Sequence, residues 1–136
     1  MIATMPVLTP EIPVIDLVHP LPGFPDHHRF ALVQLDDTGV LCQLRSLDDP
    51  SLRFLVVPPV AFFPDYAPVV NDDVVGDLEI TDVDDVVVLL VLNAGDSLST
   101  TTANLLAPVV VNTATHRASQ VILDDPDLPI AAPLVA

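Results

Sequence analysis

The side chains best suited to chemistry in this chain are four histidines, one cysteine and a large excess of carboxylates. His27 and His28 are adjacent, but neighbouring side chains of a strand point to opposite faces. No cysteine or third histidine lies at ligand spacing from them, so the pair does not indicate a metal centre. The four glycines are isolated from one another, so the chain has no glycine-rich cradle for a phosphate group.

A nucleophilic triad can be assembled on paper from His116, Ser119 and one of the many aspartates. The chain lacks a nucleophile elbow, however, and any acidic sequence permits the same combination. The acidic residues between positions 72 and 79 lack the alternating oxygen ligands of a calcium loop. We therefore expect no enzymatic activity, metal or cofactor. A hydrolase using His116 or aspartates stays open as an alternative, and it requires an aspartate whose pKa lies well above about 3.9.

Carboxylates dominate the charge of the chain, since 19 Asp and Glu face only 4 Lys and Arg and give a net charge of −15. Disordered chains combine high charge with low hydrophobicity, whereas 51% of this chain is hydrophobic, so we expect a folded core. So few cations cannot neutralise a phosphate backbone, which argues against direct nucleic-acid binding. The same field attracts basic proteins, although the charge could also serve solubility alone.

Cys42 is the only cysteine, so an intramolecular disulfide is impossible, and its apolar neighbours predict a buried, inert thiol. The N-terminal segment has no basic residues and is interrupted by prolines, unlike a secretory signal. The longest uncharged apolar run, Val86 to Leu92, is far shorter than the ~20 residues of a membrane helix. These features predict a soluble cytoplasmic protein without membrane contact.

Short runs of Val, Ile and Leu, broken by Pro, Asp and Gly, are typical of strands. The 15 prolines argue further against a helical fold. A chain of this length predicts one domain over residues 1–136, with roughly 12 N-terminal and 10 C-terminal residues peripheral. The expected strands span residues 14–18, 30–35, 40–44, 53–57, 86–92, 105–111 and 120–123.

Several connections between these strands carry turn residues. Residues 36–39, with Gly39 last, predict a short hairpin loop, and residues 113–115 begin the link to a second hairpin. Asp48, Asp49 and Pro50 predict a cap and one helical turn. Asn71 predicts the cap of a short helix that reaches Leu78, although Gly76 inside it costs about 1 kcal/mol relative to Ala.

Two strand candidates have special features. The run at 86–92 is continuously apolar, so we expect it to be central and covered on both faces. Pro108 lies inside the pattern at 105–111 and predicts an edge or bulge, where a partner could add a strand.

Four segments are not explained by composition. They are Leu-Pro-Gly-Phe-Pro-Asp at 21–26, Ser-Leu-Asp-Asp-Pro-Ser-Leu-Arg-Phe at 46–54, Phe-Phe-Pro-Asp-Tyr at 62–66 and Thr-Ala-Asn-Leu-Leu-Ala-Pro-Val-Val-Val-Asn at 102–112. In this order and spacing they closely resemble the flagellar assembly factor FliW family, from Ile15 to Asp125. The chain departs from the family pattern at Pro20, where relatives often carry glycine, and in its uncharged tail after Asp127.

This resemblance implies an all-β fold: a small single-domain, barrel-like antiparallel sheet with one or two short helical turns and no enzymatic activity. It also implies two protein partners. Flagellin is bound before export, as by a chaperone, and CsrA is a small basic dimer that represses flagellin translation by binding its messenger. Once flagellin is secreted, the freed factor binds CsrA and translation resumes. The charge of −15 gives a physical reason for the second partner.

Residues of these segments can serve the core or a partner. We interpret the apolar ones as core, namely Phe24, Phe54, Phe62, Leu105 and Val109 to Val111. Asp48, Asp49, Asp65 and Tyr66 lie at expected turns, and aromatic residues beside charge recur at interfaces, so they are candidate partner contacts. Asn104 is either a buried, hydrogen-bonded amide or a partner contact. We expect a monomer until a partner is added, and an acidic structural subunit of an oligomer stays open as an alternative.

Overall fold

The structure is a computed structural model that describes residues 14–19, 27–35, 40–49, 51–59, 62–125 and 127–134. Three features of the sequence lie outside these residues: the segment at 21–26 with Phe24, the hairpin loop at 36–39, and Pro50. The described chain is almost entirely β, with one short helix and two 3-10 turns.

The elements are short and follow one another closely. In chain order they are β1 (Val14–Leu17), β2 (Arg29–Gln34), β3 (Cys42–Ser46), β4 (Arg53–Val57), α1 (Asp72–Asp77), η2 (Val83–Asp85), β5 (Val86–Asn93), η3 (Leu98–Thr100), β6 (Thr102–Ala103), β7 (Val109–Asn112), β8 (Arg117–Gln120) and β9 (Ala132–Pro133).

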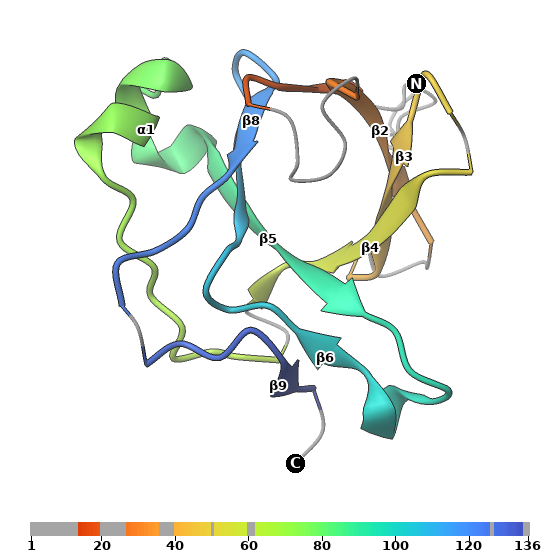
Figure 1. Cartoon of the computed structure of the whole chain (residues 1–136). Helices are drawn as coiled ribbons and strands as arrows, with labels where there is room; N and C mark the ends of the chain where they lie inside the picture. The colour runs from red at the N-terminus through yellow and green to blue at the C-terminus, as the bar shows by residue number, and fades with distance from the viewer. Residues whose placement is uncertain are drawn as a thin grey trace, which may run out of the picture.

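The strands form one sheet that closes on itself. Its order is β4-β3-β2-β1-β8-β7-β5-β6-β9, and β4 also pairs with β5, so that seven strands make a closed barrel (Figure 1). The strands β6 and β9 extend from β5 outside this ring. All pairs are antiparallel except β1 with β8, which is parallel. The predicted all-β, barrel-like fold is confirmed.

Alternating side chains of the strands fill the barrel. On β1 and β3 every second residue is buried, because successive side chains of a strand point to opposite faces. The rings of Phe30 and Phe54 lie 6.1 Å apart inside this arrangement. Cys42 is buried there, as predicted. We call this cluster the barrel core: Ile15, Leu17, Phe30, Cys42, Leu44, Val56, Leu89, Val109, Val111 and Ala118.

A second apolar layer covers the outside of the barrel beneath α1, which Figure 1 shows beside β5 and β8. On β7, Val109 and Val111 enter the barrel core, whereas Val110 points outward to this layer. Its buried members, which we call the outer core, are Leu78, Val110, Val121 and Leu123. The segments that flank α1 are thereby fixed against the barrel wall.

The strand β5 holds the sheet together because it pairs with β4, β6 and β7. Its consecutive residues Leu89 and Leu90 are both buried, in clusters on opposite faces. The prediction of a central strand covered on both faces is confirmed at these residues. It is wrong at Val87, whose side chain is exposed.

Most predicted strands are present, with shifted ends. The strand at 53–57 agrees with β4, whereas β3 begins two residues later than the expected strand at 40–44. The expected strand at 105–111 begins only at Val109, after Pro108. The strand at 120–123 is wrong: β8 ends at Gln120, and Ile122 is exposed. The apolar pattern did not predict β8 because its buried residues, Ala118 and Ser119, are small and not strongly apolar.

The predicted turns can be compared with the backbone. Asn71 caps α1, because its side-chain oxygen accepts a hydrogen bond from the N–H of Val74 at 3.0 Å. Both hairpins are confirmed by the antiparallel pairing of β2 with β3 and of β7 with β8. After Asp49, the side-chain carboxylate accepts from the N–H of Ser51 at 3.1 Å and the carbonyl accepts from the N–H of Leu52 at 2.9 Å, so the predicted cap and single turn ending at Leu52 are present.

Candidate functional site

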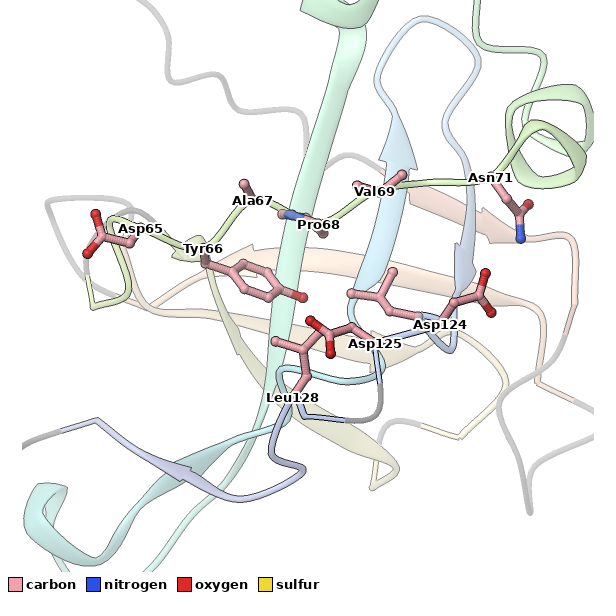
Figure 2. A pocket seen from close by; sticks show the side chains of 10 residues that line it. Asp65, Tyr66, Ala67, Pro68, Val69, Asn71, Asp124, Asp125 and Leu128 are labelled. Carbon is pink, nitrogen blue, oxygen red and sulfur yellow. The ribbon is translucent and has the colours of Figure 1, made fainter.

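A groove of about 560 Å³ opens between the segment that leads into α1 and the segment that follows β8. Its apolar part includes Tyr66, Pro68, Leu123 and Leu128. Figure 2 shows the Tyr66 ring turned toward Leu128, while the Asp65 carboxylate points away from that ring. We call this site the tyrosine groove, and its lining residues are Asp65, Tyr66, Ala67, Pro68, Val69, Asn71, Leu123, Asp124, Asp125 and Leu128.

Tyr66 is held at both of its ends. Its backbone N–H donates to the carbonyl of Phe63 at 3.0 Å, and its hydroxyl donates to the carbonyl of Leu105 at 2.6 Å. The ring packs against the outer core and against a second apolar cluster that contains Leu90 and Leu105. Burial disfavours the charged phenolate and raises the pKa of Tyr66 to about 12. Tyr66 is therefore a fixed, neutral part of the groove.

Asn104 shapes the loop that receives this hydrogen bond. Its side-chain oxygen accepts from the backbone N–H groups of Leu106 and Ala107, each at 3.0 Å. Its own N–H donates to the carbonyl of Val91 on β5. The half-buried amide thus fixes the turn that presents the Leu105 carbonyl to Tyr66. Two of the predicted partner contacts, Tyr66 and Asn104, meet at Leu105.

The prediction of an open backbone at Pro108 is wrong. The Pro108 side chain is fully buried, and its carbonyl accepts from Val121 at 2.9 Å. The preceding residues are also bonded, since Leu123 donates to Leu106 and the Gln120 side chain donates to the carbonyl of Ala107. The proline ends the loop just before β7, where a missing N–H removes no ladder bond.

Carboxylates form the rim of the tyrosine groove. Asp65, Asp124 and Asp125 are exposed, and the lining residues that the structure describes include no cationic side chain. Asp125 also organises the next turn, because its side chain accepts from the N–H of Asp127 at 3.0 Å. Sequence reasoning found Asp65 but missed Asp124 and Asp125. Their adjacency directly after the apolar segment ending at Leu123 was the available signal.

Asp48 and Asp49 belong to a different place, the turn between β3 and β4. Both backbone N–H groups lie 3.2 Å from the hydroxyl oxygen of buried Ser46, which accepts from them. The Asp49 carboxylate accepts from the hydroxyl of Ser51 at 2.6 Å and from its N–H at 3.1 Å. These bonds, with a smaller contribution from His27, lower the pKa of Asp49. The structure does not bring this pair into the tyrosine groove.

The residues considered for enzymatic chemistry lie in different surroundings. His27 shares a 2.8 Å hydrogen bond with the Ser46 hydroxyl. His116 is exposed with φ of 64°, whereas Ser119 is buried on β8. The shift of Asp49 is opposite to the raised pKa that the hydrolase alternative requires. Among the residues that the structure describes, no group of three His, Cys, Asp or Glu side chains is placed to hold a metal ion.

Sequence reasoning also missed Asn112, the most buried amide of the outer wall. Its side-chain nitrogen donates to the carbonyls of Leu78 at 2.8 Å and Glu79 at 3.1 Å. Its oxygen accepts from the N–H of Ala114 at 2.9 Å. Because Glu79 has a φ of 57°, the chain turns sharply after α1, and Asn112 binds the carbonyls exposed there. It fixes α1 to the β7–β8 hairpin.

Comparison with known proteins agrees with this architecture. A sequence profile described as FliW protein matches residues 3–134, almost the whole chain. This chain belongs to the FliW family. The flagellar assembly factor FliW of Bacillus pumilus is 37% identical over 115 residues, covering 85% of this chain and 80% of that protein. The corresponding factor of Syntrophus aciditrophicus is 36% identical over 108 residues, covering 79% and 68%.

A solved structure supports the same assignment. The crystal structure of a flagellar assembly factor FliW matches this fold with a TM-score of 0.85 at 31% sequence identity. The match covers 90% of this chain and 86% of that one. The resemblance to flagellar assembly factors is thus confirmed. In the described part of the chain, none of the helices has the length and apolar character needed to cross a membrane.

Proposed function

We propose that this FliW-family protein works by binding other proteins: it binds flagellin before export, and it antagonises the RNA-binding repressor CsrA. Binding of CsrA would relieve repression of flagellin translation. The observation that carries the proposal is the tyrosine groove, an apolar floor surrounded by three exposed carboxylates in a chain of net charge −15. Such a surface suits protein docking and repels nucleic acid.

The anionic rim supports the part of the proposal that concerns CsrA. A small basic dimer that binds RNA must present cations, and these would be attracted to Asp65, Asp124 and Asp125. Asp48 and Asp49, exposed on the β3–β4 turn, add a second anionic position. Because the protein carries few cations of its own, it would compete with RNA for the regulator instead of joining the complex.

The apolar part of the groove supports binding of flagellin. Tyr66 is held rigidly by its hydrogen bond to Leu105, and Val69 at the lining is 84% exposed. Tyrosine is enriched at interface hot spots, and the exposed valine adds apolar area around it. Flagellin would bury this surface until export, which agrees with a protein that is monomeric before a partner is added.

A competition experiment tests the regulatory function. Purified CsrA is bound to a labelled flagellin messenger fragment, and increasing amounts of this protein are added. We expect the RNA to be released, and we expect a pull-down from motile cells to recover flagellin or CsrA. Release of no RNA, together with recovery of neither partner at low and moderate salt, would refute the proposal.

Charge variants then locate the surface. The triple variant Asp65→Asn, Asp124→Asn and Asp125→Asn should weaken CsrA binding. The control triple variant Asp72→Asn, Asp73→Asn and Asp96→Asn changes the net charge of −15 by the same three units at other exposed positions. A double variant of Asp48 and Asp49 tests the β3–β4 turn separately. Equal weakening by both triple variants would mean that overall charge matters and the groove does not.

A further inference from the structure

A second groove, of about 600 Å³, lies beside the first half of β5. We call it the valine groove. The segment with Pro68 and Val70 lines it together with Val86 and Val88 of β5, and Asp82 adds a carboxylate. The site shares only Pro68 with the tyrosine groove. The feature of this groove that matters here is the hydrogen bonding of the β5 backbone beside it.

The hydrogen-bond pattern shows which way the backbone of Val88 points. Thr113 donates to the carbonyl of Asp85 at 2.8 Å, and the β5–β7 register pairs Val87 with Val111 and Val88 with Val110. In an antiparallel ladder, residues that exchange hydrogen bonds alternate with residues that do not. The N–H and carbonyl of Val87 therefore face β7, whereas those of Val88 face the opposite side.

On that opposite side the neighbouring strand stops too early to reach Val88. The strand β4 pairs only with Leu90 and Val91, and it ends at Val57. Pro58 and Pro59 follow, and neither has a backbone N–H to donate. The described chain places no strand beside Val88 there. The N–H of Val86 donates to the carbonyl of Val83. The Val86 carbonyl faces the same side of β5 as the N–H and carbonyl of Val88.

From this arrangement we propose that the valine groove is a strand-addition site for an extended segment of a partner protein, with alternating apolar residues and basic flanks. An antiparallel segment would make three backbone hydrogen bonds, two with Val88 and one to the Val86 carbonyl. Its alternate side chains would enter the apolar groove. The inference concerns a different surface from the tyrosine groove and does not depend on the identity of flagellin or CsrA.

The negative charges near the groove favour a bound segment with basic flanks. Asp82 lines the groove, and Asp84 and Asp85 follow it in η2. In a chain with a net charge of −15, a second acidic copy would be repelled, whereas basic flanks would be attracted. Val83 is 80% exposed at the groove, so an apolar contact is available beside these carboxylates.

Hydrogen exchange of the protein alone gives the first test. The Val88 amide should exchange much faster than those of Val87 and Leu89, which bond to β7. A synthetic peptide that alternates valine and threonine between lysine ends should bind and slow the exchange of Val88. A Val88 amide as protected as its neighbours in the free monomer, or a peptide that does not bind, would overturn the proposal.

Backbone methylation of the peptide makes the test specific. Methyl groups on the amide nitrogens of the edge facing Val88 should weaken binding about tenfold or more, because two hydrogen bonds are lost. Methyl groups on the other edge should change affinity little. Equal effects on both edges would show ordinary apolar binding and would refute strand addition. Replacing the lysine ends by glutamate should weaken binding as well.

Variants of the protein supply the matched control. Val83→Lys places a cation at the groove and should weaken the lysine-flanked peptide about twofold to fivefold. Ile122→Lys makes the same change at a position 72% exposed and outside the groove, and should have no effect. A stable dimer with a protected Val88 amide would instead assign the edge to a second copy. Because the peptides contain no flagellin or CsrA sequence, failure here leaves the proposed function untouched.

Discussion

The hydroxyl of Tyr66 donates a 2.6 Å hydrogen bond to the carbonyl of Leu105, 39 positions later in the chain. This bond joins the segment before α1 to the loop before β7, two parts that no strand pairing among the described residues connects directly. The ring of Tyr66 also forms part of the tyrosine groove. Stability and the shape of the candidate binding surface therefore depend on the same contact.

Replacing Tyr66 by Phe keeps the ring and removes the hydroxyl. The carbonyl of Leu105 then loses its partner in a partly buried position, so the free energy of unfolding should fall by about 1–3 kcal/mol. Urea unfolding followed by circular dichroism measures the change. Ser99→Ala, which removes an exposed hydroxyl, should stay within about 0.5 kcal/mol of the unchanged protein. An equal effect of the two variants would contradict a structural role for the hydrogen bond.

The ionisation of Tyr66 can be observed directly, because it is the only tyrosine and the chain has no tryptophan. Its pKa of about 12 in the folded protein exceeds the ordinary value of 10.0. The folded state thus holds the proton more tightly than the unfolded state does. This contribution to stability is complete below pH 10 and is lost as the pH rises toward about 12. Absorbance of the tyrosinate should titrate near 12, and a midpoint near 10 in the folded protein would contradict the burial.

A substitution of Asn112 should lower the free energy of unfolding strongly, although asparagine is a polar residue. Asn112→Asp has nearly the same shape but cannot donate to the carbonyls of Leu78 and Glu79, so the buried carboxylate would face two acceptors. We expect a loss of about 3 kcal/mol or more in thermal or urea unfolding. Asn93→Asp, at the exposed end of β5, is the control and should be nearly neutral. Similar stability of both variants would contradict the proposed link between α1 and the β7–β8 hairpin.

Ser51 should control the titration of Asp49. The hydrogen bonds from Ser51 lower the pKa of the carboxylate from its ordinary value of 3.8. Their contribution to stability is present above pH 3.8 and is lost as the pH falls through the lower folded value. In Ser51→Ala the hydroxyl is absent, so the midpoint of Asp49 measured by carboxyl NMR should rise toward 3.8. Ser97→Ala should leave it unchanged.

The sequence predicted the parts of the fold that local residues determine. Asn71 caps α1 and the run at 53–57 forms β4, because capping and apolar patterning act within a few residues. The closing pair of β4 and β5 and the parallel pair of β1 and β8 join distant segments, and no local pattern specifies them. The strand β8 was misplaced because Ala118 and Ser119 are buried without being strongly apolar.

The candidate site was predicted less completely for the same reason. Asp65 and Tyr66 were found from their position beside a turn, and the structure places both in the tyrosine groove. Asp124 and Asp125 join them only because the chain after β8 returns across the outer core, where Leu123 bonds to Leu106. The sequence predicted an open backbone at Pro108, and the structure contradicts this prediction. The strand-addition site proposed at Val88 depends instead on the end of β4 before Pro58 and Pro59, which the pattern of β5 alone does not specify.

The two proposed partners should differ in their response to salt. Attraction between exposed carboxylates and a basic dimer acts over the Debye length, which shortens from about 10 Å at 0.1 M to about 3 Å at 1 M ionic strength. Affinity for CsrA should therefore fall steeply between these conditions, whereas burial of the apolar floor around Tyr66 and Val69 by flagellin should change little or strengthen. Calorimetric titration of each purified partner over a salt series measures both.

The acidic control variant of Asp72, Asp73 and Asp96 should keep the steep salt dependence of CsrA binding, while the variant of Asp65, Asp124 and Asp125 should flatten it. Equal salt dependence of the two partners would mean that the anionic rim does not distinguish them.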